Sequence, residues 1–145
     1  MGCKKLYDVY SKLEEENIAV NSVSFLKEEK AVAFKSPESN VFWIGINHNR
    51  IHSEREELCV IMEEKAHYDV GIVPNNFLSN SYCDRLTREK NELKAKKLAV
   101  KRLVPKDKLL NYIKDHYYLD LDELADYFEV TPQFMKQALG VYGLN

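Results

Sequence analysis

The sequence predicts an α+β fold in which a small antiparallel sheet precedes a helical C-terminal half. Short runs of β-branched and aromatic residues, separated by turn residues, lie between residues 18 and 46. From residue 53 onward, apolar residues recur at helical spacing, and capping residues divide the chain into separate helices. The chain has 145 residues, of which 45% are hydrophobic, so it is long enough to bury one core.

The N-terminal part is expected to contain one helix and three strands. The helix covers residues 4–16, whose apolar side chains share one face. The strands cover residues 18–26, 31–35 and 41–46, and the turn-forming residues 36–40 separate the second strand from the third. We expect these strands to pair in an antiparallel sheet.

The remaining chain is expected to be helical. Ser53 and Glu56 form a capping box that starts a helix, and Gly71 ends it. Residues 72–83 resemble a loop, and the next helix covers residues 87–104. Three short helices follow at residues 106–115, 121–128 and 132–139, of which the second is capped by Asp120 and the third by Thr131. We expect a single domain, 1–145, with the sheet and two long helices in 1–104 and the C-terminal helices in 105–145.

Composition excludes several classes of function. A net charge of −2 argues against a general nucleic-acid or membrane binder, and no apolar run approaches the roughly 20 residues of a membrane span. No signal peptide precedes the first helix, which predicts a cytoplasmic protein. Cys3, Cys59 and Cys83 are odd in number and lack paired spacing, so we expect free thiols in a reducing compartment.

Glu63 and His67 are the first candidate site residues. They lie one turn apart and therefore share a helix face. The same face carries a core-like stripe of residues: Cys59, Met62, Glu63, Ala66, His67 and Val70. A carboxylate on such a stripe is costly unless it is neutralised, and a divalent metal held by Glu63 and His67 would neutralise it. This is the spacing of a zincin-like helix, H-E-x-x-H, with Glu64 at the position of the base.

A catalytic zinc site needs a third protein ligand. Glu92 is the best candidate, because it shares a stripe with two alanines that let another helix approach closely. The stripe consists of Glu92, Ala95, Ala99 and Leu103. Glu92 would then lie at the end of a narrow apolar seam facing the first site helix. Burying the Glu92 carboxylate would be costly without a neutralising partner, as it would be for Glu63.

Three segments together resemble the ImmA/IrrE-type metallopeptidases, particularly the short members found in phages and mobile elements. They are Cys59-Val-Ile-Met-Glu63-Glu64-Lys-Ala-His67-Tyr68, Glu92-Leu-Lys-Ala95-Lys-Lys-Leu-Ala99, and Leu121-Asp-Glu-Leu-Ala-Asp-Tyr-Phe-Glu-Val-Thr-Pro-Gln-Phe. The resemblance covers nearly the whole chain. It departs from the family pattern at three places: many members have His in place of Glu63, a small residue in place of Met62, and Leu-Gly in place of Lys65-Ala66.

The resemblance implies a metal held by Glu63, His67 and Glu92, with Glu64 as general base. Zinc is the expected ion. Because two carboxylates and one imidazole cancel the charge of a divalent cation, the site should also tolerate Mn or Fe. The implied activity is slow, selective cleavage of a helix-turn-helix repressor of a phage or mobile element. The expected partner is therefore a repressor-type protein, with neither nucleic acid nor a membrane bound directly.

Other interpretations remain open. One alternative is a peptidase fold that binds the repressor without cutting it, and another is a DNA-binding regulator that uses its C-terminal helices. Residues 115–129 carry six acids and no Lys or Arg, which disfavours the regulator. If Glu63 is solvated and His67 is a hydrogen-bonded core residue, the two side chains do not form a metal site. Cys59 is expected to be a core thiol, although it lies close enough to approach a metal. The basic run 84–108 is a solvated helix face or a docking surface for an acidic partner.

Overall fold

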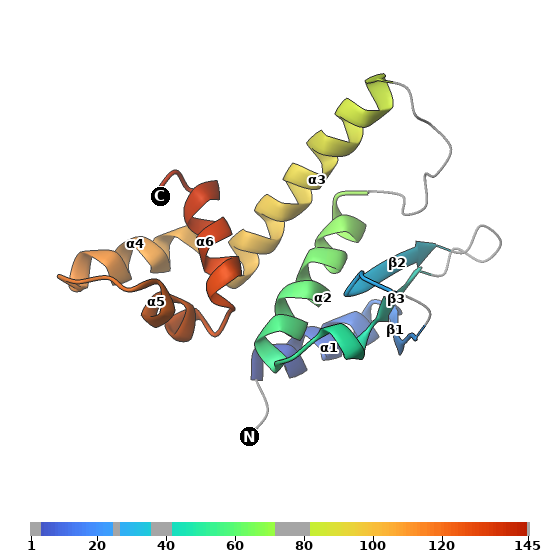
Figure 1. Cartoon of the computed structure of the whole chain (residues 1–145), viewed down its shortest axis with the longest axis horizontal. Helices are drawn as coiled ribbons and strands as arrows, with labels where there is room; N and C mark the ends of the chain where they lie inside the picture. The colour runs from blue at the N-terminus through green and yellow to red at the C-terminus, as the bar shows by residue number, and fades with distance from the viewer. Residues whose placement is uncertain (1–3, 25–26, 36–41, 72–81, 145) are drawn as a thin grey trace.

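A computed structural model describes residues 4–24, 27–35, 42–71 and 82–144, with the backbone alone described at 34–35 and 82–88. Figure 1 shows the described part as an elongated molecule, with the sheet at one end and the C-terminal helices at the other. The elements, in chain order, are α1 (Lys4–Glu15), β1 (Ala19–Ser22), β2 (Ala31–Lys35), β3 (Phe42–Ile46), the 3-10 turn η1 (His48–Arg50), α2 (Glu54–Asp69), α3 (Tyr82–Leu103), α4 (Lys106–Asp115), α5 (Leu121–Phe128) and α6 (Pro132–Val141). The α+β class and the helical C-terminal half are confirmed.

The sheet is mixed, so the expectation of an antiparallel sheet is wrong for one of its pairs. The strand order is β1-β3-β2. β2 and β3 are antiparallel, with Ala31 opposite Ile46, whereas β1 and β3 are parallel, with Ala19 opposite Trp43. A tight two-residue turn would have forced β1 and β2 into a hairpin. The longer link between them lets the chain reach the far edge of the sheet before β2 begins.

Two element boundaries also differ from the prediction. β1 is shorter than the predicted strand 18–26, because it pairs with only four residues of β3. α3 begins at Tyr82 rather than at residue 87, so the predicted loop 72–83 is wrong at its end. No Pro or Gly lies between residues 82 and 87 to stop the helix from extending. The rest of that loop prediction, the predicted turn 36–40, residues 25, 26 and 41 of the predicted strands, Cys3 and the side chain of Cys83 fall outside the described part of the chain.

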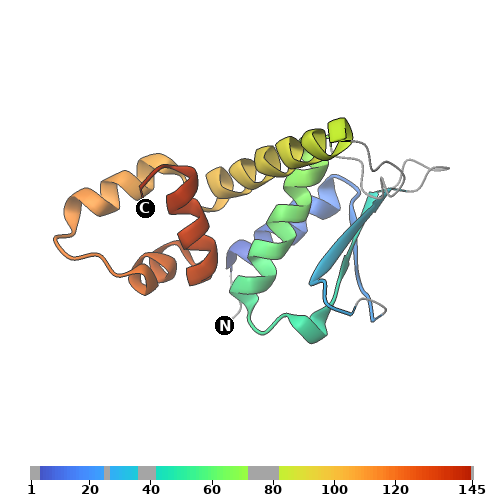
Figure 2. The same cartoon turned by 45° about the horizontal axis from the view of Figure 1, so that its top comes forward.

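α2 lies at the centre of the fold. It packs against the sheet and α1 on one side and against α3 along its length (Figure 2). Ile44 and Ile46 of β3 and Leu58 and Ile61 of α2 are fully buried at this centre. A single apolar cluster continues from there through Val100 and Val104 into the C-terminal helices. No described helix is long and apolar enough to cross a bilayer.

Three contacts link the C-terminal helices to the N-terminal part. The Tyr142 hydroxyl donates to the Val104 carbonyl at 2.7 Å, and the Lys5 ammonium donates to the Phe128 carbonyl at 2.5 Å. Arg55 at the start of α2 forms an ion pair with Asp126 of α5 at 2.5 Å. α6 itself packs against α5 and α3.

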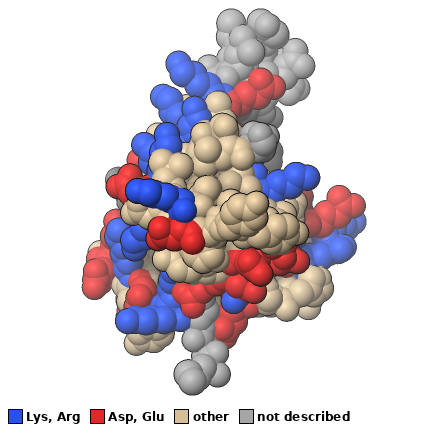
Figure 3. Space-filling model, turned by 90° about the vertical axis from the view of Figure 1, so that its left-hand side faces the viewer, with Lys and Arg blue, Asp and Glu red and all other residues tan. Residues whose placement is uncertain are grey.

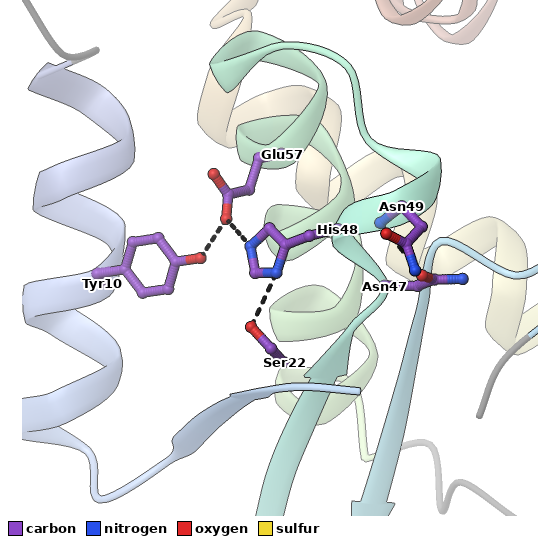
Figure 4. A network of polar contacts seen from close by, with 6 residues as sticks. All are labelled: Tyr10, Ser22, Asn47, His48, Asn49 and Glu57. Carbon is purple, nitrogen blue, oxygen red and sulfur yellow. Dashed lines mark hydrogen bonds and ion pairs between the residues drawn. The ribbon is translucent and has the colours of Figure 1, made fainter. Parts of the chain in front are cut away.

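A polar network fixes the beginning of α2 (Figure 4). One carboxylate oxygen of Glu57 accepts from the Tyr10 hydroxyl at 2.7 Å and contacts Nε2 of His48 at 3.1 Å. Nδ1 of the same imidazole lies 2.8 Å from the Ser22 hydroxyl. The network therefore joins α1, β1 and η1 to α2. His48, which is exposed in η1, connects Ser22 of β1 to Glu57 of α2.

Loss of the tyrosine hydroxyl should weaken this anchor. We expect Tyr10→Phe to lower the free energy of unfolding by about 1.5 kcal/mol, because a hydrogen bond to a carboxylate is lost while the ring still packs. Urea unfolding measures the difference. Tyr7→Phe is the matched control, since Tyr7 lies on the same helix and is 71% exposed. Equal effects of the two substitutions would contradict the role given to this hydrogen bond.

Candidate active site

α2 presents the two predicted site residues Glu63 and His67 on one face, at the edge of its buried stripe. The helix begins where the Ser53 hydroxyl accepts from the Glu56 amide, and Gly71, with φ of +79°, follows its end. The predicted stripe is confirmed for three of its apolar members, Cys59, Met62 and Ala66, which are buried, whereas Val70 at its end is partly buried. Glu63 and His67 are half-buried, which leaves their polar ends facing a cleft.

His67 meets Glu92 of α3 across the seam between the two helices. Nε2 of His67 lies 2.8 Å from a carboxylate oxygen of Glu92. Ala95 and Ala99 are buried in this seam, where small side chains let α3 approach α2 closely. The structure therefore brings together residues that are 25 positions apart in the sequence, as the two stripes predicted.

The expected burial of Glu92 is wrong. Its side chain is 61% exposed, whereas that of His67 is 21% exposed. The apolar seam ends at Ala95, and beyond it α3 extends past the end of α2 (Figure 1). Solvent therefore reaches Glu92 from the open side, and the argument from the cost of burying a carboxylate does not apply to it.

The predicted ligands share a cleft of about 520 Å³. The residues that line it are Glu63, His67, Glu89, Glu92, Leu93, Lys96 and Gln137. A second cleft of about 410 Å³ continues between α2 and the start of α6, and Glu63 and Gln137 line both clefts. Gln137 was missed by sequence reasoning. A lone glutamine on a short helix carries no pattern that distinguishes it from a surface residue.

Glu64 occupies a different place from Glu63. One of its carboxylate oxygens lies 3.5 Å from Nδ1 of His67, on the side of the imidazole opposite Glu92. Glu64 is not among the residues that line the cleft. The imidazole is thus held between two carboxylates, one contacting each ring nitrogen. Such an arrangement fixes the orientation of the ring.

One of the comparisons with known proteins found a match, and it is to a protein family. The profile of the IrrE N-terminal-like domain, a peptidase family, matches residues 13–139, which is most of the chain. The chain belongs to the IrrE N-terminal-like family. No curated protein and no solved structure matched it. Membership places the chain among proteins of the metallopeptidase type and implies a metal cofactor, typically zinc.

Carboxylates surround the His67 imidazole and shift the pKa values of the candidate site. Burial lowers the pKa of His67, but the hydrogen bond and charge of Glu64, together with Glu92, outweigh it and raise the pKa to about 9. Burial, followed by the charge of Glu64, raises the pKa of Glu63 above its ordinary value. In the protein without metal, a proton on His67 therefore offsets part of the negative charge of three neighbouring carboxylates.

This donor set fits the metal that the family implies. Carboxylate oxygens and an imidazole nitrogen suit zinc, and a divalent cation can replace the proton between His67 and Glu92. Among the described residues, however, no group of three or more His, Cys, Asp or Glu side chains is arranged closely enough to hold an ion. The paired contact is His67–Glu92, with Glu63 in the wall of the same cleft. Their roles as ligands stay a prediction.

Cys59 is a poor alternative ligand. Its thiol is free and buried. Burial raises its pKa to about 11, although hydrogen bonds with Thr131 act in the opposite direction. A thiol with this pKa is protonated at neutral pH, whereas metals bind the thiolate. Cys59 lines the second cleft and behaves as the core thiol that its position in the stripe predicted.

The opposite side of α2 is held by an ionic cluster. Lys65, whose side chain is only 4% exposed, contacts Glu16 at 2.8 Å and Asp69 at 2.6 Å. Arg102 of α3 reaches the other oxygen of Asp69 at 2.5 Å. Lys65 lies two residues after Glu63 and therefore on the far side of the helix. This cluster fixes the rotation of α2 about its axis, and so fixes where Glu63 and His67 point.

Proposed function

We propose that this chain is a metal-dependent peptidase whose metal is held by Glu63, His67 and Glu92. Glu64 serves as the general base. The observation that carries this proposal is the 2.8 Å contact between His67 of α2 and Glu92 of α3, beside Glu63 in one cleft, in a member of a peptidase family. Its sequence is E-E-x-x-H in place of H-E-x-x-H.

Each side chain of the proposed site has a separate role in the reaction. A bound divalent cation supplies a Lewis acid that polarises the scissile carbonyl and acidifies water. Glu64 accepts a proton from the attacking water and returns it to the leaving amine. Its contact with Nδ1 also keeps Nε2 of His67 aimed at Glu92. The Gln137 amide, with one acceptor and two donors, matches the backbone of a peptide lying along the two joined clefts.

The proposed substrate is a helix-turn-helix repressor of a phage or mobile element, and zinc, Mn or Fe is the proposed ion. The support for the substrate is the resemblance to the short phage-like members. Two carboxylates and one imidazole neutralise a divalent ion, whereas a site with two imidazoles leaves it positive. A less positive ion activates the carbonyl less, which suits slow and selective cleavage.

A second candidate function is a protein-binding module that recognises the repressor without cutting it. The observation in its favour is that the described residues hold the His67–Glu92 pair but no closed set of three ligands. Under this alternative, a proton on His67 permanently balances part of the charge of the neighbouring carboxylates. The cleft then binds a peptide without a metal and without cleaving it.

Metal content and cleavage together test the proposal. The purified chain should retain one zinc ion after dialysis, and Glu92→Gln should retain far less, because a neutral amide is a weak ligand. A peptide library made from a tryptic digest of a bacterial proteome should yield new termini in mass spectrometry, and EDTA should suppress them. Lys97→Gln, on the exposed surface of α3, is the matched control. Metal-free protein that still binds library peptides would support the binding module instead.

A further inference from the structure

The loop between α4 and α5 exposes more aromatic surface than any other described segment. Tyr117 is fully exposed, Tyr118 is 77% exposed, and Leu119 beside them is partly exposed. Tyr127 on α5 adds a further exposed ring. Soluble proteins seldom leave such side chains clustered in water unless the cluster contacts another molecule. The loop lies at the end of the molecule opposite the sheet (Figure 1).

Three of the rings in this region, those of Tyr112, His116 and Tyr127, are held by contacts with one another. Tyr112 stacks on His116 with centroids 3.8 Å apart, and its other neighbour, Tyr127, lies 4.4 Å away. Nδ1 of His116 lies 2.7 Å from the Tyr112 carbonyl oxygen. We call the set Tyr112, His116, Tyr117, Tyr118, Leu119 and Tyr127 the aromatic tip. Rings that are already held in place lose little entropy when a partner binds.

A hollow accompanies these rings. It measures about 530 Å³, and Tyr112, His116 and Tyr127 line it together with Lys108, Asn111 and Asp115. It therefore mixes aromatic faces with a carboxylate and one lysine at its border. The size is sufficient for one or two side chains of a partner.

Acidic residues outnumber basic residues around the aromatic tip, although α4 carries Lys106, Lys108 and Lys114. Residues 115–129 contain six acids and no Lys or Arg. One of the six, Asp126, is paired with Arg55, and the exposed remainder includes Asp115, Asp122 and Glu123. Figure 3, which faces this end of the molecule, shows an uncharged central surface with Asp and Glu along its lower border and Lys and Arg along its left border. The surface is therefore apolar in its centre and negative along one border.

This charge decides what the aromatic tip can bind. Nucleic acids and anionic membranes would be repelled by the acids. A second copy presenting the same face would bring like charges together. A cationic protein segment is attracted, and an arginine can lie flat on a tyrosine ring while it pairs with a neighbouring carboxylate. We propose that the aromatic tip is a docking surface for a cationic, partly apolar helix of a partner protein. This role does not depend on hydrolysis at the α2–α3 cleft.

The test uses short synthetic peptides as probes: an amphipathic Leu/Arg helix, a Leu/Glu helix of the same pattern and an unstructured Ser/Arg peptide. The Leu/Arg helix should bind the whole chain and shift the backbone amide signals of residues 112–127 in NMR spectra. The double variant Tyr117→Ser/Tyr118→Ser should weaken binding about tenfold or more, as loss of central aromatic anchors does. Both side chains are exposed, so the variant should fold, which circular dichroism verifies.

Two matched controls distinguish binding at the aromatic tip from non-specific attraction of the cationic peptide to the protein. Tyr7→Ser removes an exposed tyrosine of α1 and should leave the affinity unchanged. Asp115→Asn/Glu123→Gln should weaken binding, whereas Glu14→Gln/Glu15→Gln, which removes the same charge from α1, should not. Failure of the Leu/Arg helix to bind, equal weakening by Tyr7→Ser, or equal binding of the Leu/Glu helix would overturn the proposal. Self-association or vesicle binding that the double variant abolishes would overturn it in favour of a second copy or a membrane.

Discussion

Glu64→Gln should reduce peptide hydrolysis about a thousandfold while leaving the zinc content of the protein nearly unchanged. The amide cannot accept the proton of the attacking water, and removal of a general base typically has an effect of this size. The substitution keeps the size of the side chain and a polar atom near Nδ1 of His67. Cleavage of a library peptide by zinc-loaded protein, with zinc measured by elemental analysis, gives both quantities from one preparation.

Two further variants make this result decisive. His67→Ala should lose both zinc and hydrolysis, because the imidazole contacts Glu92 directly. Glu63→Gln should lose zinc first and hydrolysis as a consequence. If Glu64→Gln loses zinc and Glu63→Gln keeps it, the roles of the two neighbouring carboxylates must be exchanged. Glu63 would then be the base, consistent with its position in the cleft wall and with the pKa that burial and the charge of Glu64 raise.

Lys65→Ala should lower the free energy of unfolding by about 3 kcal/mol, because the buried side-chain stem of Lys65 and both of its ion pairs are lost together. Its ammonium lies within 2.8 Å of Glu16 and 2.6 Å of Asp69. Lys65→Met should cost less, since it keeps an apolar stem of similar length in the same space. Lys97→Ala, on the exposed surface of α3, is the control and should be close to neutral. Urea unfolding of the four proteins gives the comparison.

The effect of Lys65→Ala should depend on pH. Burial raises the pKa of Asp69, but hydrogen bonds and charges from Lys65 and Arg102 outweigh it and hold the pKa below its ordinary value of 3.8. A carboxyl group of this kind stabilises the fold above its unfolded pKa and ceases to do so as the pH falls through the folded one. The difference between wild type and variant should therefore narrow below about pH 4. A difference that stays constant in acid would show that Asp69 does not carry the effect.

The features predicted correctly from the sequence are local ones. The sequence identifies Ser53, Asp120 and Thr131 as helix caps, and each accepts a backbone amide in the structure. A cap depends on residues within one turn, so the sequence alone contains the information. The predicted direction of β1 is wrong because strand pairing depends on where a distant strand lies. The sequence shows which residues can form strands but not which neighbours they find.

The candidate site is predictable only in part. The stripes on two helices correctly predict that His67 and Glu92 meet, because helical spacing fixes which residues share a face. The exposure of Glu92 depends on how far α3 extends past α2, and no residue near Glu92 encodes it. Gln137 reaches the cleft only because α6 packs beside α2. Lys65 is a departure from the family pattern, yet its burial requires partners from α1 and α3 that no local pattern indicates.

The ionic cluster behind α2 gives the protein a particular response to heat. The free energy of hydrating charged groups becomes less favourable on warming, so keeping the Lys65 ammonium away from water costs less at high temperature than at low. The stabilisation from apolar contacts such as those of Ala95 and Ala99 reaches a plateau over the same range. The ionic cluster, which keeps Glu63 and His67 turned toward α3, is therefore the contact that heating weakens least. Activity should persist on heating until the fold itself is lost.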